Sequence, residues 1–202
     1  MRLSHVLLSV LAVLPSMAAA EGEIAVTLGT GTPWTFRCPT AGTRVTYSDG
    51  STLTAGGADA ASPLICRVGG ATGEQRLVFG LFTAEGEIGA RFLEAAQRLA
   101  AGRAGTMVAF SVPGPAGLGP VRHEWRIGPA RSVELPAGAF RAVTLERQVR
   151  PRLASGGEGL GLFADSIDIA SGVVLQRRSE IAEGDQRTQG LTVEVVRVEA
   201  AR

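Results

Sequence analysis

The stretch AGTMVAFS, residues 104–111, decides the predicted fold because most of the chain repeats its pattern. In an extended strand, Thr106, Val108 and Phe110 lie on one side and the residues between them lie on the other. The Ala-Gly at its start is typical of a turn, where glycine permits a positive φ. The stretch therefore predicts a turn followed by a strand with one face in the core.

A closely similar stretch, AGTRVTYS, occupies residues 41–48. Here Val45 and Tyr47 take the places of Val108 and Phe110. Two interpretations stay open: a true structural repeat, or chance similarity in a chain rich in Ala, Gly, Thr and Val. Both interpretations predict a second turn followed by a core-facing strand.

The same alternation of apolar and polar residues recurs along the chain. It predicts strands at 24–28, 34–38, 64–68, 76–82, 106–112, 121–127, 131–135, 139–149, 159–169, 172–181 and 191–198. Residues 85–101 differ, because their apolar residues follow helical spacing and Gly102 stands where a helix would end.

These elements predict a mainly β fold. We expect a strongly curled antiparallel sheet, half-barrel or barrel-like, with one covering helix, and a sandwich is the alternative. The expected organisation is a signal peptide at 1–20 and a single β-rich domain at 21–202, made of disulfide-bearing strands at 21–84, the helix at 85–102 and the remaining antiparallel sheet at 103–202.

The first twenty residues are typical of an export signal. Arg2 precedes an apolar run from Leu3 to Leu14, and small residues lead to a predicted cleavage site after Ala20. The alternative is an uncleaved anchor, but the run is short for a bilayer span. We expect a periplasmic or secreted protein with no transmembrane segment in the mature chain.

Charge and composition exclude several classes of function. The chain has 20 basic and 19 acidic residues, and every basic residue is Arg. Schiff-base catalysis, a Walker-A phosphate loop and a Ser-Lys dyad all need Lys, so the sequence excludes them. The balanced charge and the lack of a long basic run argue against nucleic acid as a partner.

Two cysteines, Cys38 and Cys66, are the only thiols in the chain. In an exported protein such a pair predicts one structural disulfide. The alternative is a metal-binding or redox pair, which would need closer spacing or a nearby histidine.

The sequence offers little catalytic chemistry. His123 is the only histidine after the predicted signal peptide, and no G-x-S-x-G motif is present. Asp165 and Asp168 could form a carboxylate pair of the kind that hydrolyses glycosides, although solvated turn residues are the simpler interpretation. We therefore assign no catalytic residue, no metal site and no cofactor.

The stretch VRHEWRI, residues 121–127, places His123 and Trp125 on the inward face of a strand. One interpretation is a core histidine that is hydrogen-bonded to a neighbour. The other is a polar anchor inside an apolar ligand cavity. On the second interpretation the ligand-binding residues are His123, Trp125, Phe110 and Val108.

Several elements between Gly102 and Val198 resemble those of periplasmic β-domains of proteobacteria. They include VELPAGAF at 133–140, SGVVL at 171–175 and the closing strand GLTVEVVRV. Those domains are in turn similar to the curled sheets of Lol-type lipoprotein carriers. The resemblance covers about half of the chain, and none of the carriers' binding residues maps onto it.

The resemblance implies a curled sheet that encloses an apolar ligand. We therefore expect an exported, non-enzymatic β-protein of the cell envelope that binds a lipid or another apolar ligand in the concave sheet. The alternatives are a structural or interaction module whose partner is an envelope protein, and a hydrolase.

Overall fold

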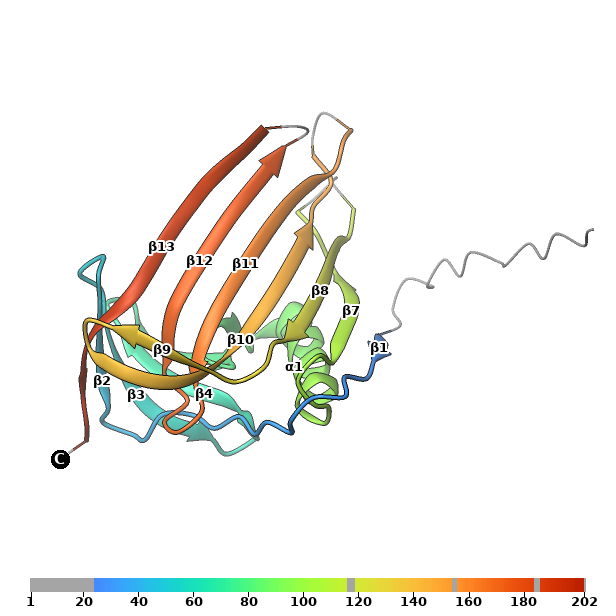
Figure 1. The fold of residues 1–202 in the computed structure, drawn as a ribbon. Helices are drawn as coiled ribbons and strands as arrows, with labels where there is room; N and C mark the ends of the chain where they lie inside the picture. The colour runs from blue at the N-terminus through green and yellow to red at the C-terminus, as the bar shows by residue number, and fades with distance from the viewer. Residues whose placement is uncertain (1–23, 116–118, 154–155, 184–185, 202) are drawn as a thin grey trace, which may run out of the picture.

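The computed structural model describes residues 24–115, 119–153, 156–183 and 186–201, so the predicted signal peptide lies outside the described residues. The fold is mainly β, as predicted, with thirteen strands and one helix in this part of the chain (Figure 1). The elements in chain order are β1 (Ala25–Thr27), β2 (Arg44–Tyr47), β3 (Thr52–Asp59), β4 (Ser62–Gly70), β5 (Gly73–Val78), β6 (Phe82–Thr83), α1 (Gly86–Ala100), β7 (Met107–Val112), β8 (Val121–Ile127), β9 (Arg131–Leu135), β10 (Gly138–Arg150), β11 (Gly159–Asp168), β12 (Val174–Glu183) and β13 (Gln186–Glu199).

All thirteen described strands belong to one antiparallel sheet. Its order is β1-β7-β8-β10-β11-β12-β13-β2-β3-β4-β5-β6, and β9 pairs with β10 outside this path. The sheet is not closed, because β1 and β6 are its two ends among the described strands. It is also not strongly curled, so the half-barrel or barrel-like shape expected from the sequence is wrong.

Strand β13 carries the sheet from one layer to another. Its first part pairs with β12 up to Glu194, and its last part pairs with β2 from Val195 to Glu199. The register shifts between Val195 and Arg197, which is where a bulge bends a strand. Strands β2, β3 and β4 consequently lie beneath the long strands β10 to β12, with α1 beside them (Figure 1). We call β1, β7, β8 and β10–β12 the first layer, and β2–β6 the second layer.

The main core lies between the two layers and α1. Its fully buried members come from both layers and from the helix, and include Trp125, Leu145, Val78, Phe79 and Leu99. The helix is confirmed, and it buries Phe92, Ala96 and Leu99 as its spacing predicts. Ile88, which lies one helical turn before Phe92, is the exception, with 37% of its surface exposed.

A smaller core lies at the base of the long strands. Val45 and Tyr47 of β2 pack there with Leu175 and Val195. Partly buried residues of the β9–β10 hairpin, including Phe140, pack against the same cluster. This hairpin crosses the base of β11 and β12 in Figure 1. The long strands are therefore held at their base from two sides.

Both copies of the recurring stretch form the predicted turn and strand. Val108 and Phe110 are buried in β7, and Val45 and Tyr47 are buried in β2. The glycines that begin the two copies have φ values of +86° (residue 42) and +91° (residue 105), a region that favours glycine. The two strands have different neighbours in the sheet, so the similarity is local.

Before the helix, two predicted strands need correction and one strand was not predicted. Residues 34–38 form no strand, although Trp34 and Phe36 are buried against Phe79, because an irregular segment can also fill a core. The predicted strand 76–82 is broken at Phe79, which has a φ of +55°. Strand β3 was not predicted, because its run TLTAGGAD lacks alternating large apolar residues.

The predicted disulfide is present. It joins Cys38, in the segment before β2, to Cys66 in β4, with a Cα–Cα distance of 5.3 Å. Cys66 is fully buried beside the main core. The bond therefore ties the irregular segment that carries Trp34 and Phe36 to the second layer.

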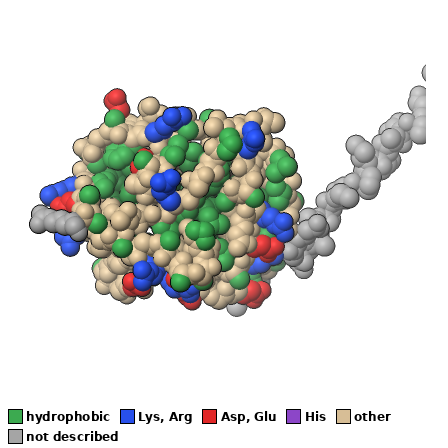
Figure 2. All heavy atoms as spheres, turned by 90° about the horizontal axis from the view of Figure 1, so that it is seen from below, with side chains coloured by type: hydrophobic (Ala, Val, Ile, Leu, Met, Phe, Trp, Pro, Cys, Tyr) green, Lys and Arg blue, Asp and Glu red, His purple; other side chains and the backbone are tan. Residues whose placement is uncertain are grey.

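The surface is mixed in charge. On the face shown in Figure 2, hydrophobic side chains gather over the middle, with Arg side chains among them and acidic side chains mainly near the rim. This distribution agrees with the near balance of 20 basic and 19 acidic residues.

Candidate ligand-binding pocket

A half-open pocket lies under the long strands, on the side that faces the second layer. Its volume is about 530 Å³, within the usual range for ligand sites. Strands β10 to β13 form one wall, and the β2–β3 hairpin and the segment before β6 form the other. The apolar lining residues are Leu53, Leu81, Phe82, Phe163, Val174, Leu191 and Val193.

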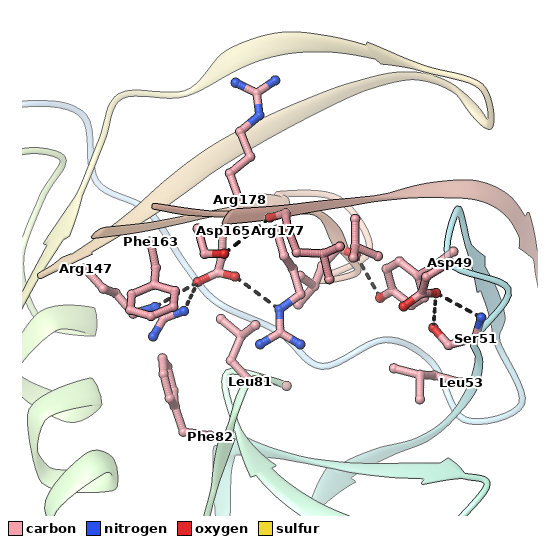
Figure 3. A pocket seen from close by; sticks show the side chains of 16 residues that line it. Asp49, Ser51, Leu53, Leu81, Phe82, Arg147, Phe163, Asp165, Arg177 and Arg178 are labelled. Carbon is pink, nitrogen blue, oxygen red and sulfur yellow. Dashed lines mark hydrogen bonds and ion pairs between the residues drawn. The ribbon is translucent and has the colours of Figure 1, made fainter. Parts of the chain in front are cut away.

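Three charged side chains form a cluster in the first-layer wall (Figure 3). Asp165 of β11 accepts a hydrogen bond from Arg147 Nε at 2.8 Å, and Arg147 Nη2 lies 2.8 Å from the same oxygen. The other carboxylate oxygen of Asp165 accepts a hydrogen bond from Arg177 Nε at 3.3 Å. Asp165 and Arg177 are directly opposite each other in the register of β11 and β12. One carboxylate therefore holds two guanidinium groups.

The environment of Arg147 is largely apolar. Its Cζ lies 4.8 Å from the centroid of the Phe82 ring and 4.4 Å from that of Phe163, distances that suit cation–π contacts. Only 8% of its side chain and 1% of that of Asp165 are exposed. Burial lowers the pKa of Arg147, and the charge of Asp165 opposes this shift. Arg147 is thus a buried cation that depends on Asp165.

Arg177 differs from Arg147 in its exposure. Half of its side chain, 51%, is exposed, and its guanidinium extends into the pocket toward Leu81 (Figure 3). Its Nε is held by Asp165, and neither terminal nitrogen has a hydrogen-bond partner among the described residues. Two oriented donors therefore face the pocket.

The opposite wall is polar at its rim. Tyr47 donates a hydrogen bond from its hydroxyl to the carbonyl oxygen of Val174 at 2.9 Å. Burial raises the pKa of Tyr47 to about 12. In the turn after β2, Asp49 accepts hydrogen bonds from the side chain and the backbone of Ser51, and these lower the pKa of Asp49. This end of the pocket therefore carries a negative charge.

The four ligand-binding residues predicted from the sequence lie elsewhere. The structure does bring Val108, Phe110, His123 and Trp125 together, all buried in neighbouring strands β7 and β8. Phe110, His123 and Trp125 pack against Phe92 of α1, and Val108 belongs to the same main core. None of the four lines the pocket described above. Their role in binding stays a prediction.

His123 is enclosed by aromatic rings. It stacks on Phe110 with centroids 5.2 Å apart, and Phe92 meets it edge-on at 5.4 Å. Its Nδ1 has no hydrogen-bond partner among the described residues. Burial, together with the charge of Arg147, lowers the pKa of His123 to about 4. The side chain is therefore neutral at ordinary pH.

The two candidate carboxylates are not solvated turn residues, because both are buried. Asp165 is held by the two arginines, whereas Asp168 accepts hydrogen bonds from the backbone and hydroxyl of Ser171. They therefore belong to separate hydrogen-bond networks. In the part of the chain that the structure describes, no three His, Cys, Asp or Glu side chains gather as a metal site requires.

The sequence did contain a signal for the charged cluster. Val143, Leu145 and Arg147 alternate along β10, and Phe163 and Asp165 alternate along β11. Opposite charges on the apolar faces of consecutive strands predict a buried ion pair. Arg177 carries no comparable signal, because a bulge between β11 and β12 changes the alternation.

Comparisons with known proteins found little. No family model matches the chain, and no curated protein is similar to it. One solved structure is similar: a Bacteroides fragilis NCTC 9343 protein that is predicted to be exported and has a YmcC-like fold. It is 13% identical, with a TM-score of 0.37, over 82% of this chain and 99% of that one. Among the described helices, none combines the length and apolar character of a membrane span.

Proposed function

We propose that this protein is an exported, non-enzymatic binding protein that holds a lipid or another apolar ligand in the pocket under β10–β13. The observation that supports this most directly is the half-open pocket of about 530 Å³ with seven apolar side chains in its walls. Exposed apolar surface that is hollowed and bounded by rigid strands is typical of a ligand site.

The bend in β13 also supports the proposed binding, because it leaves apolar side chains of the long strands uncovered. The bulge in β13 sends the end of that strand into the second layer, which leaves Leu191, 68% exposed, on the part still paired within the first layer. Packing in the second layer therefore does not cover every apolar side chain of the long strands. A ligand with apolar surface would remove these side chains from water.

The disulfide supports the exported location. Such bonds form and persist in oxidising compartments such as the periplasm. The predicted signal peptide at 1–20 points to the same route.

The experiment uses Nile red, an uncharged apolar dye whose fluorescence increases in apolar surroundings. The purified protein is expected to bind the dye, and Ser179→Phe is expected to abolish binding because Ser179 lines the pocket. The matched control is Ser132→Phe, on the exposed edge strand β9. Equal dye binding by both variants and the unaltered protein would contradict the proposal.

A further inference from the structure

We infer that the ligand is an amphiphile with one negative charge, and that its acidic head group binds the two terminal nitrogens of Arg177. This inference rests on the proposed function and names the chemical class of its ligand. A carboxylate on an apolar tail is the chemistry to which we commit.

The first step is the orientation of Arg177. Its Nε is fixed by Asp165, which in turn is fixed by Arg147 inside the wall. The guanidinium is therefore held in place before any ligand arrives, and its terminal nitrogens extend into the pocket (Figure 3). A planar pair of N–H donors matches the two oxygens of a carboxylate.

The second step is the charge of the cluster. Two arginines and one aspartate leave a single positive charge in the cluster, and Arg178, which also borders the pocket, points its side chain away from them (Figure 3). One negative charge on the ligand would neutralise the cluster. Asp49 lies in the turn of the other wall and would repel a second anionic group. The charges therefore favour one acidic head group at the Arg177 end.

The third step is the surroundings of the head group. Leu81, Phe82 and Phe163 lie next to the cluster in the same pocket, and Leu191 and Val193 lie along the β13 wall. Apolar walls that begin beside a charged donor suit a molecule with an acidic end and an apolar tail. They do not suit a small, fully hydrated anion.

The experiment is displacement of Nile red by dodecanoate and by dodecanol at mildly alkaline pH, below the concentrations at which either aggregates. Dodecanoate is expected to displace the dye at roughly tenfold lower concentration, the usual value of one charge-assisted interaction in a partly exposed site. Arg177→Gln should bring the ratio close to one, and Arg177→Lys should restore part of it.

The matched control is Arg178→Gln. Arg178 is the next residue along β12 and carries the same charge, but its side chain points away from the cluster (Figure 3). This variant should keep the preference of the unaltered protein. An equal loss in both variants would mean that overall charge, not Arg177, sets the preference, and would overturn the inference.

The outcomes separate the two proposals. If Nile red binds and Ser179→Phe blocks it, but dodecanoate and dodecanol displace it equally, the pocket stands and the acidic head group is wrong. If displacement by dodecyl phosphate is stronger than by dodecanoate, the assignment of a single charge is wrong. If Nile red does not bind in the pocket, both the proposed function and this inference fall.

Discussion

The two halves of the first layer, β7–β8 and β11–β12, differ in what covers their inward faces. At β7 and β8 the inward side chains are covered by α1 and the second layer, and they form an aromatic core around Trp125. At β11 and β12 the inward face carries Asp165 and Arg177 and borders the pocket. One sheet therefore has a closed half that is buried in the main core and an open half that borders a pocket.

The difference follows from what packs against each half. The helix contacts β7 and β8 but not β11 or β12 among its main neighbours. Where a second element removes water, apolar packing is the stable solution. Where the covering is partial, charged groups can remain, provided that each buried charge has a partner.

The largest expected effect is in the closed half. Trp125 is fully buried and stacks on Phe82 and Phe92, so Trp125→Ala should lower the free energy of unfolding by about 4 kcal/mol. Phe163→Ala, in the open half, should cost about 2 kcal/mol because Phe163 is only half-buried. Urea unfolding measures both. Equal losses would remove the distinction between the halves.

The next effect is in the charged cluster. Asp165→Asn leaves Arg147 buried beside two rings without its counter-ion, which should cost about 3 kcal/mol. The control is Asp59→Asn, which removes a carboxylate from the more exposed pair with Arg76 and should cost much less. Denaturant unfolding of the two variants compares them. A stable Asp165→Asn protein would show that Arg147 does not need Asp165.

A smaller effect depends on pH. His123 has a folded-state pKa of about 4, whereas in the unfolded chain it has the ordinary value of about 6.5. Between these values the unfolded state binds the proton first, so acid favours unfolding. The free energy of unfolding should fall by about 2 kcal/mol from pH 7 to pH 5 because of this group.

The control for this prediction is His123→Phe, which keeps a ring against Phe110 and Phe92 but cannot bind a proton. Its unfolding should be less sensitive to pH over this range, as measured by chemical denaturation at each pH. A pH profile parallel to that of the unaltered protein would show that His123 takes up protons equally in both states.

The smallest effect on stability is expected at Arg177. Because half of this side chain is in water, Arg177→Gln should change the free energy of unfolding by less than about 1 kcal/mol. The same variant should lose the preference for an acidic ligand. Thermal unfolding measured beside dye displacement tests both statements. A large loss of stability would place Arg177 with Arg147 as a structural residue.

Much of the fold was predictable because strands and helices leave periodic patterns. Alternation located β7 and β8, helical spacing located α1, and the cysteine pair predicted the disulfide. The sequence analysis failed where the residues show neither alternation nor helical spacing. Strand β3 is made of small residues, and Trp34 reaches the core from an irregular segment.

The candidate site was harder to predict than the fold. Alternation showed that His123 and Trp125 point inward, but it does not show which inward residues are covered. Coverage depends on where α1 and the second layer pack, which is a long-range property. The four predicted residues lie in the main core, and their role in binding stays a prediction, whereas the sequence analysis did not single out Arg147 and Arg177.

The amino-acid sequence by itself determined the inward and outward faces of most strands, the helix α1 and both copies of the turn-and-strand pattern, because these depend on neighbours a few residues apart. Only the tertiary structure decided that the sheet bends at β13 instead of closing, and that one carboxylate holds two arginines beside a pocket. Those features join residues far apart in the chain, and their energies come from the packing of whole layers.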